Sequence, residues 1–409
     1  MRKMKDSGVE WIGEIPKDWN CMRLKFAFGN SNVGESVDKE LYSSDENGYI
    51  FYTAGANPVK TSYTEFPMWK YTTDNDILLA RNGTPYIYLP SKDAVYSDHI
   101  IRINIKDGYC RRFLRYCLQR SIESIIVDSV SIATWSISLW KEQKLPLPYY
   151  HEQKYLADYL DSKCSKIDEI IEKQQAIIKK LKEYKFSIIT EAVTKGINPD
   201  VELKDSTIDM CEQIPVHWGI SQNRYLFSLR DEKNYKPLEE VRLLSLYTDL
   251  GVFPHGEQEE RGNKAVKAEG YKVVYENDIV VNIILAWMGA IGRSAYDGVT
   301  SPAYDIYKPN ENVCSRYYHY LYRTKPFSAE CYKYGRGIMA MRWRTYSSEF
   351  KSIKVPVPPY IEQCQIADYL DSKCEMLDKT IADRNKAIDI LQEYKKSLIY
   401  EVVTGKMEV

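Results

Sequence analysis

Residues 157–164, ADYLDSKC, recur letter for letter at residues 367–374. The match is part of a longer one, because residues 152–194 resemble residues 362–404 at the same displacement of 210 positions. An eight-residue identity at a fixed displacement is not expected by chance. The chain is therefore a tandem duplication, and a repeat of this length decides the architecture before any local pattern does.

A second repeated motif has a shorter displacement. Ile15-Pro16-x-x-Trp19 returns as Ile214-Pro215-x-x-Trp218, which is 199 positions later. Each repeat thus consists of a block of variable length followed by a nearly constant block. The end of the chain, residues 403–406, resembles residues 193–196, and the sequence after residue 196 resembles the N-terminus. Read as a circle, the sequence continues through its own start, which predicts a pseudo-twofold molecule with neighbouring termini.

The composition is typical of a soluble globular protein. The 409 residues are enough for two or more domains, and 44% of them are hydrophobic. No apolar run approaches the roughly 18 residues of a membrane span, and the first six residues lack the apolar core of a signal peptide. Nine cysteines without a CxxC pair indicate free thiols in a reducing compartment. We therefore expect a cytoplasmic protein without membrane contact.

The constant blocks predict two long helices. After Pro146 and Pro356 the sequence switches to a helical period, with apolar residues at steps of three, four or seven. These positions are Ile167, Ile171, Ile178, Leu181, Ile188 and Ala192 in the first copy, and Leu377, Ile381, Ile388, Leu391, Leu398 and Val402 in the second. Such a seam with charged flanks is typical of a coiled coil. Its candidate spacer and partner-binding residues are Leu181, Ile188, Leu391 and Leu398.

The circular pseudosymmetry predicts that these helices run antiparallel and face each other through the seam. The alternative is that each helix packs only on its own globular block. The variable blocks, residues 1–145 and 199–355, indicate short strands and turns, with an Asn-Asp turn before the apolar runs at Ile77 and Ile279. We therefore predict an α+β fold in which two pseudo-twofold-related mixed α/β globular domains are joined by two long antiparallel helices that form a coiled coil.

No motif in the sequence predicts catalysis. GxGxxG, GxxxxGK[ST] and HExxH are absent, and the five histidines lack the spacing of metal ligands. Val357-Pro358-Pro359-Tyr360 is similar to the NPPY motif of amino-methyltransferases, but valine cannot accept the amine hydrogens that the first residue of that motif binds. We therefore expect neither an enzyme nor a cofactor or metal, and a self-contained methyltransferase is disfavoured.

Loops that combine arginine, asparagine and aromatic residues are candidates for contact with base edges, since arginine is the usual partner of guanine and asparagine of adenine. The candidates are Arg81, Asn82, Thr84 and Thr134 in the first block, and Tyr247, Thr248, Asn282, Trp287, Arg336, Arg342 and Arg344 in the second. For each residue alone, an ordinary solvated loop position is the alternative. The net charge of −1 means that DNA contacts must come from local clusters, with a basic partner supplying further affinity.

Together these features closely resemble the specificity subunit of type I restriction–modification systems. The residues that carry the resemblance are the segment from Asp6 to Trp19, the segment Ser301-Pro302-Ala303-Tyr304, and Pro-x-Pro-x-x-x-Glu-Gln before each long helix. The resemblance implies two target recognition domains and two conserved spacer helices. The domains would be residues 1–145 and 199–355, and the spacers residues 146–198 and 356–409. The first domain departs from the commoner pattern at Ser97-Asp98-His99.

The resemblance also implies a function. The chain would bind double-stranded DNA at a bipartite asymmetric target, with one half-site per domain. It would direct two modification (methyltransferase) subunits and the restriction (ATP-dependent translocase and nuclease) subunits, without catalysis of its own. The alternative is a coiled-coil scaffold that displays two protein-binding domains, and binding of a defined bipartite duplex would separate the two.

Overall fold

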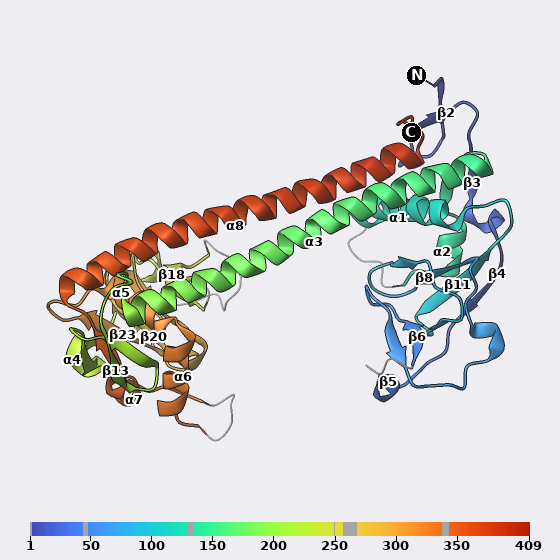
Figure 1. Cartoon of the computed structure of the whole chain (residues 1–409). Coiled ribbons are helices and arrows are strands. Elements are labelled where there is room, and N and C mark those ends of the chain that lie inside the picture. Colours follow the sequence, from blue (N-terminus) through green and yellow to red (C-terminus); the bar gives the residue numbers. More distant parts are fainter. Residues whose placement is uncertain (1, 44–47, 129–133, 249, 257–267, 338–342) are drawn as a thin grey trace. The chain divides into compact units, whose positions relative to one another are not determined.

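The computed structural model describes residues 2–409 except residues 44–47, 129–133, 249, 257–267 and 338–342 (Figure 1). Its contacts divide the chain into two units, Met1–Gln175 with Asn385–Val409, and Ala176–Arg384. Each unit contains one variable block and parts of both long helices. No helix in the described part of the chain is long and apolar enough to cross a membrane.

The first unit is built on an antiparallel four-stranded sheet. Its strand order is β4 (Phe28–Val33), β11 (Ile100–Ile105), β8 (Asp76–Ala80) and β9 (Ile87–Tyr88). All five residues of β8 are buried, as expected for the apolar run that begins at Ile77. α1 (Arg111–Asp128) packs on β8 and β9 and buries Phe113 and Leu114.

Smaller elements complete this unit. A second sheet has the order β10 (Val95–Tyr96), β6 (Tyr49–Tyr52), β7 (Val59–Thr61) and β5 (Tyr42–Ser43). Two ribbons pair β1 (Met4–Asp6) with β2 (Glu14–Pro16), and β3 (Asn20–Arg23) with β12 (Lys144–Leu147). The short helices are η1 (Leu24–Phe26), η2 (Lys39–Leu41), η3 (Met68–Lys70) and α2 (Ile137–Lys141).

The second unit repeats the main sheet with the same topology. Its strand order is β16 (Phe227–Arg230), β23 (Tyr304–Pro309), β20 (Ile279–Asn282) and β21 (Ile291–Arg293). The paired ribbons are β13 (Leu203–Ile208) with β14 (Cys211–Pro215), β15 (Gly219–Gln222) with β24 (Lys354–Val357), β17 (Leu244–Tyr247) with β18 (Gly251–Pro254), and β19 (Lys272–Val274) with β22 (Gly298–Thr300). The helices are α4 (Asn223–Leu226), η4 (Leu238–Glu240), η5 (Ala286–Met288), α5 (Ser315–Tyr322), α6 (Lys325–Tyr334) and α7 (Ser347–Ser352).

A buried aspartate lies at the start of one central strand in each main sheet, since Asp76 is the first residue of β8 and Asp278 directly precedes β20. In the first unit, Asp76 accepts a hydrogen bond from the backbone N–H of Thr73 at 2.6 Å and from the Asn104 amide at 2.7 Å. In the second, Asp278 accepts from the backbone of Tyr275 at 2.9 Å and from Arg230 Nε at 2.8 Å. A buried carboxylate is tolerated only when it is paired in this way. The Asn-Asp turn in the sequence therefore marks a structural position.

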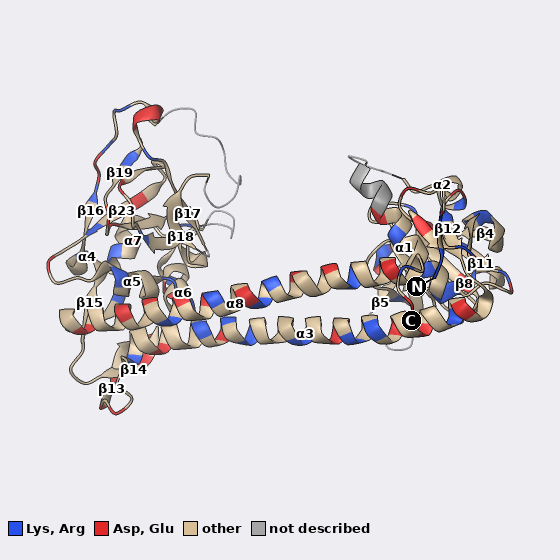
Figure 2. Cartoon of the chain, turned by 90° about the horizontal axis from the view of Figure 1, so that it is seen from above, with Lys and Arg blue, Asp and Glu red and all other residues tan. Residues whose placement is uncertain are grey.

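The two long helices are α3 (Tyr150–Lys195) and α8 (Tyr360–Val403). Each begins after its proline segment, and the Gln153 and Gln363 amides donate back to the carbonyls of Pro148 and Pro358 at 2.9 and 2.8 Å. Each ends at a glycine with positive φ, Gly196 or Gly405, which is the usual helix C-terminus. Figure 2 shows basic and acidic residues alternating along both helices, as expected for a solvated face.

The helices run antiparallel within each unit. In the first unit Asp168 of α3 pairs with Lys395 of α8 at 2.6 Å, while Tyr159 reaches Met407 beyond the end of α8. In the second, Lys185 pairs with Asp378 at 2.6 Å, and Gly196 lies beside Glu362. Residue numbers rise on one helix as they fall on the other. The two ion pairs occupy corresponding positions of the duplication, so the prediction of an antiparallel, pseudosymmetric helix pair is confirmed.

The seam is the least exposed stripe of these helices. Its buried members include Ile167, Ile171, Ile178, Ala192, Ile381, Ile388, Leu398 and Val402. Leu181, Ile188 and Leu391 are half-buried. The apolar period read from the sequence therefore coincides with the packed face.

The termini of the chain meet in the first unit, as the circular repeat predicts. The backbone N–H of Arg2 donates to Glu408 at 2.8 Å, and Lys406 donates to the carbonyl of Ile12 at 3.0 Å. Gly405 lies against Pro16 so closely that an added Cβ would stand 2.5 Å from the ring. In the second unit the chain continues directly from Gly196 into the equivalent segment. An added Cβ at Gly196 would lie 3.4 Å from the Trp218 ring.

Candidate nucleic-acid interface

The candidate loops of the first unit meet beyond the end of β8. The backbone N–H of Trp135 donates to the carbonyl of Arg81 at 2.6 Å, and Asn82 pairs with Thr134 as an isolated antiparallel bridge. Ser136 follows at once and caps α2 by accepting from the backbone of Leu139 at 3.2 Å. Two segments that are about 50 positions apart in the sequence are thus fixed side by side.

A third segment joins them, and the sequence analysis did not select it. The backbone N–H of Arg81 donates to the carbonyl of His99 at 2.8 Å, and its guanidinium reaches the carbonyl of Asp98 at 3.2 Å. The Asn82 amide lies 2.8 Å from Nδ1 of His99. The signal that could have found this segment was its departure from the Ser-Pro-Ala pattern of the second domain.

The candidate loops of the second unit are tied in the same way. The backbone N–H of Thr345 donates to the carbonyl of Ile283 at 2.9 Å, which corresponds to the bond between Trp135 and Arg81. Arg336 and Arg344 exchange backbone hydrogen bonds at 2.9 and 3.0 Å, so they lie together on a short ladder. Arg342 lies outside the described residues.

Asn282 differs from the other candidates in its surroundings. Only 7% of the residue is exposed, and its Oδ1 accepts from the backbone N–H groups of Ile284 at 3.0 Å and Leu285 at 3.3 Å. The side chain therefore shapes its own loop, in the manner of asparagine in tight turns. Its role as a base-reading residue remains a prediction.

Aromatic rings support the arginine ladder of the second unit. Trp343 stacks on Tyr332 with ring centroids 4.9 Å apart, and Trp287 meets the same tyrosine at 5.8 Å. Trp343 also donates from Nε1 to the carbonyl of Tyr332 at 2.9 Å. An added Cβ at Gly335 would lie 2.4 Å from that nitrogen, so the glycine permits the close approach.

Tyr247 and Thr248 belong to the hairpin of β17 and β18, which packs on β21. The carbonyl of Thr248 accepts from the Arg323 guanidinium at 2.9 Å. Behind the hairpin, His319 accepts through Nδ1 from the backbone N–H of Arg293 at 3.1 Å and lies against Gly251. Burial, together with the charges of Arg323 and Arg293, lowers the pKa of His319 to about 3.

This histidine predicts an acid-sensitive second domain. Below pH 6.5 the imidazole of His319 binds a proton in the unfolded chain, whereas in the folded chain it stays neutral down to about pH 3. Stability therefore falls as the pH falls from 6.5 towards 3. Part of the His319 side chain reaches solvent, which weakens this effect relative to a fully buried imidazole. We therefore expect the free energy of unfolding to fall by about 1 kcal/mol between pH 6.5 and 5. Urea unfolding at both pH values measures it. His319→Asn keeps an acceptor for Arg293 and should remove this part of the pH dependence, whereas an unchanged dependence would assign it to other groups.

Each globular block is clamped to a long helix by a corresponding set of contacts. Arg112 pairs with Asp158 and Asp161 at 2.6 Å each, and Tyr116 donates to Asp161 at 2.7 Å. The second unit repeats this arrangement, with Arg316 on Asp368 and Asp371 at 2.7 and 2.8 Å, and Tyr320 on Asp371 at 2.6 Å. Arg112 and Arg316 are therefore each paired with two carboxylates of a long helix. These contacts fix each globular block on its helix.

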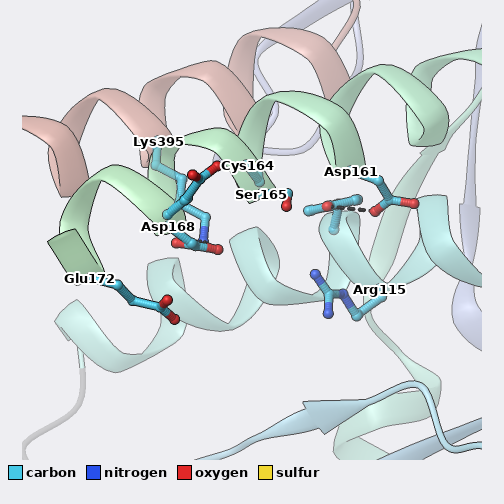
Figure 3. Close-up of a pocket in the computed structure, with 9 residues that line it drawn as sticks. Arg115, Asp161, Cys164, Ser165, Asp168, Glu172 and Lys395 are labelled. Atoms are coloured by element: carbon cyan, nitrogen blue, oxygen red, sulfur yellow. Dashed lines mark hydrogen bonds and ion pairs between the residues drawn. The ribbon is translucent and has the colours of Figure 1, made fainter.

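A polar pocket lies beside the first clamp, between α1 and the long helices (Figure 3). Its lining holds the carboxylates of Asp161, Asp168, Glu169 and Glu172 against the cations of Arg115 and Lys395. The excess of negative charge disfavours DNA phosphate there. Among the described residues, no group of three or more His, Cys, Asp or Glu side chains is arranged to hold a metal ion.

Comparison with known proteins agrees with this geometry. Residues 16–191 match the family model of the type I restriction modification DNA specificity domain. The chain is 25% identical to the putative type I restriction enzyme MjaX specificity subunit of Methanocaldococcus jannaschii, over 97% of this chain and 96% of the relative. It is 23% identical to the type I restriction enzyme MjaVIII specificity subunit of the same organism, over 97% and 94%.

A solved structure from a type I R-M system, described in terms of complex assembly and conformational transition, contains a chain with the same fold. The TM-score is 0.68 at 12% identity, over 96% of this chain and 99% of that one. The matched domain and the two relatives, which align over nearly the whole chain, support a DNA specificity subunit of a type I restriction–modification system. The solved structure supports the fold.

Proposed function

We propose that this chain reads a bipartite asymmetric DNA target with one half-site per domain. The target recognition domains would be residues 1–145 and 199–355, and the spacers residues 146–198 and 356–409. The observation that carries the proposal is the pair of equivalent backbone bonds, Trp135 to Arg81 and Thr345 to Ile283. They present corresponding loops whose side chains differ between the two domains. Two domains with different loop side chains on one scaffold should recognise two half-sites of different sequence.

The residues proposed to contact DNA follow from this arrangement. Arg81, Asn82, Thr84 and Thr134 would serve the first half-site. Tyr247, Thr248, Asn282, Trp287, Arg336, Arg342 and Arg344 would serve the second, and Asn282 also holds its own loop in shape. Arginine and asparagine can each form two hydrogen bonds with one base edge, and each such pair contributes roughly 1–3 kcal/mol of discrimination.

Partner subunits would supply the chemistry and much of the affinity. Phosphate contacts provide most of the binding free energy of DNA-binding proteins, but this chain has a net charge of −1. We therefore propose that it performs no catalysis and positions modification and restriction subunits on the DNA, in the cytoplasm. Those subunits would clamp the phosphates while the two domains select the sequence.

Methylome sequencing tests the proposed function. A host that carries this chain with its modification subunit should gain methylation at one motif made of two specific parts separated by a fixed gap of unspecified bases. The same host with the modification subunit alone should gain none. A contiguous motif, or methylation without this chain, would contradict the proposal.

We further propose that each unit binds one modification subunit through its exposed helix face. Tyr184 in the second unit and Tyr394 in the first occupy corresponding positions, and 58% and 55% of these residues are exposed. Exposed tyrosines at equivalent places are typical anchors of protein interfaces. The complex should therefore contain two modification subunits per chain.

Native mass measurement checks this stoichiometry. Tyr184→Glu and Tyr394→Glu should each reduce the complex to one modification subunit, and the double variant should bind neither. Lys396→Glu changes an exposed residue of α8 that lies two positions from Tyr394 and therefore on a different face of the helix, so it serves as a control for the added charge. A wild-type complex that saturates at one modification subunit would refute the proposal.

A further inference from the structure

Three side chains form a connected series at the candidate interface of the first unit. The amide nitrogen of Asn82 lies 2.8 Å from Nδ1 of His99, and the opposite ring nitrogen, Nε2, lies 4.0 Å from the Asp98 carboxylate. The turn that holds them is fixed by its backbone, since the N–H of Ile100 donates to the carbonyl of Ser97 at 2.9 Å. His99 and Asp98 remain exposed to solvent.

The series favours one orientation of the Asn82 amide. A neutral imidazole has one N–H and one bare nitrogen, and the hydrogen bond at one nitrogen sets the role of the other. The negative charge of Asp98 favours the proton on Nε2 of His99. Nδ1 is then the acceptor, and it holds the NH₂ group of Asn82. The Asn82 Oδ1 and its second N–H are left to face outward.

This orientation has a consequence for base recognition. Adenine presents a donor, the N6 amino group, beside an acceptor, N7, whereas guanine presents two acceptors, O6 and N7. An outward Oδ1 beside an outward N–H matches adenine and sets an oxygen against O6 of guanine. The reversed amide would engage Oδ1 with His99 and turn both remaining N–H groups outward, which suits guanine instead.

We propose that His99, assisted by Asp98, is a positioning residue that makes Asn82 select adenine in the first half-site. The inference rests on the proposed function, because it names the base that this loop reads. The second domain provides an internal contrast. There Ile284, Pro302 and Ala303 stand at the positions of Asn82, Asp98 and His99, so the device belongs to the first half-site alone.

Base analogues in the target duplex test the contact. With the chain assembled with its modification subunits, each adenine of the first half-site is replaced in turn by 7-deazaadenine, which lacks N7, or by purine, which lacks the N6 amino group. One position should lose roughly tenfold or more in affinity with either analogue. Asn82→Ala should bind weakly and show no further loss at that position. The adenines of the second half-site in the same duplex serve as the control.

Variants of His99 test the positioning role. Wild type should prefer adenine over guanine at the sensitive position, and His99→Leu should reduce that preference roughly tenfold or more. His99→Asn places an acceptor oxygen near the site of Nδ1 and should retain most of it. Recognition of the second half-site should be unchanged in both variants, which also verifies that they are folded.

The outcomes separate this inference from the proposed function. If the complex binds a bipartite target but no first-half-site adenine responds in an Asn82-dependent way, the amide contact is wrong and the proposed function stands. The same holds if the first half-site contains no A·T pair. An undiminished adenine preference in His99→Leu would remove His99 from the mechanism. If no bipartite target is bound, both proposals fail.

Discussion

Replacing residues 199–355 with the equivalent domain of another specificity subunit should change one half of the target and leave the other half and the gap unaltered. The candidate readers of the first half-site are tied to one another within the first unit, through Arg81, Asn82 and Trp135. The second unit has a separate apolar core that includes Trp218, Tyr307 and Phe350. An exchange of one variable block therefore leaves the contacts of the other intact.

The expected effect is large. Each wrong base pair costs roughly 1–3 kcal/mol, and the costs of separate positions add approximately. A half-site with three specific base pairs would thus shift preference by about two orders of magnitude or more. Methylome sequencing of the host reads the new motif directly. The matched control is the reciprocal exchange of residues 1–145, which should change only the other half, and a change in both halves would contradict the modular function.

Sequence reasoning predicted the parts of the fold that the duplication repeats. The antiparallel helices, their seam and their glycine ends follow from residues present in both copies, such as Gln153 and Gln363. The ion pair between Asp168 and Lys395 follows from the duplication, because its repeat mates Asp378 and Lys185 form the equivalent pair in the second unit. A contact that occurs twice leaves the same residues at two places in the sequence, so it can be recognised without a structure.

Contacts that occur once could not be predicted in this way. The second sheet of the first unit, β5 to β7 with β10, has no counterpart of the same order among the described residues of the second unit. Likewise, the contact between Asn82 and His99 joins two loops of one domain that share no periodic pattern. Asn282 is a different case, because its Oδ1 accepts backbone hydrogen bonds of its own loop while its role in base reading stays a prediction. Residue type alone does not separate these roles.

The burial of the seam gives the last expectation. Leu398→Asp should destabilise the chain strongly, since Leu398 is only 2% exposed on α8. Removing a buried leucine side chain costs about 2–5 kcal/mol, and the unpaired carboxylate adds a desolvation cost. We expect a fall of about 10 °C in the melting temperature of the first unit. Leu391→Asp should cost less, because Leu391 is half-buried.

Ile390→Asp is the matched control, because it introduces the same charge on the same helix at a residue that is 60% exposed. An exposed substitution of this kind changes stability by about 0.5 kcal/mol or less. Thermal unfolding followed by circular dichroism compares the three variants. Equal melting temperatures for Leu398→Asp and Ile390→Asp would mean that the seam does not hold the helices together. Since both candidate partner faces lie on these helices, a loosened pair should also bind the modification subunits less tightly.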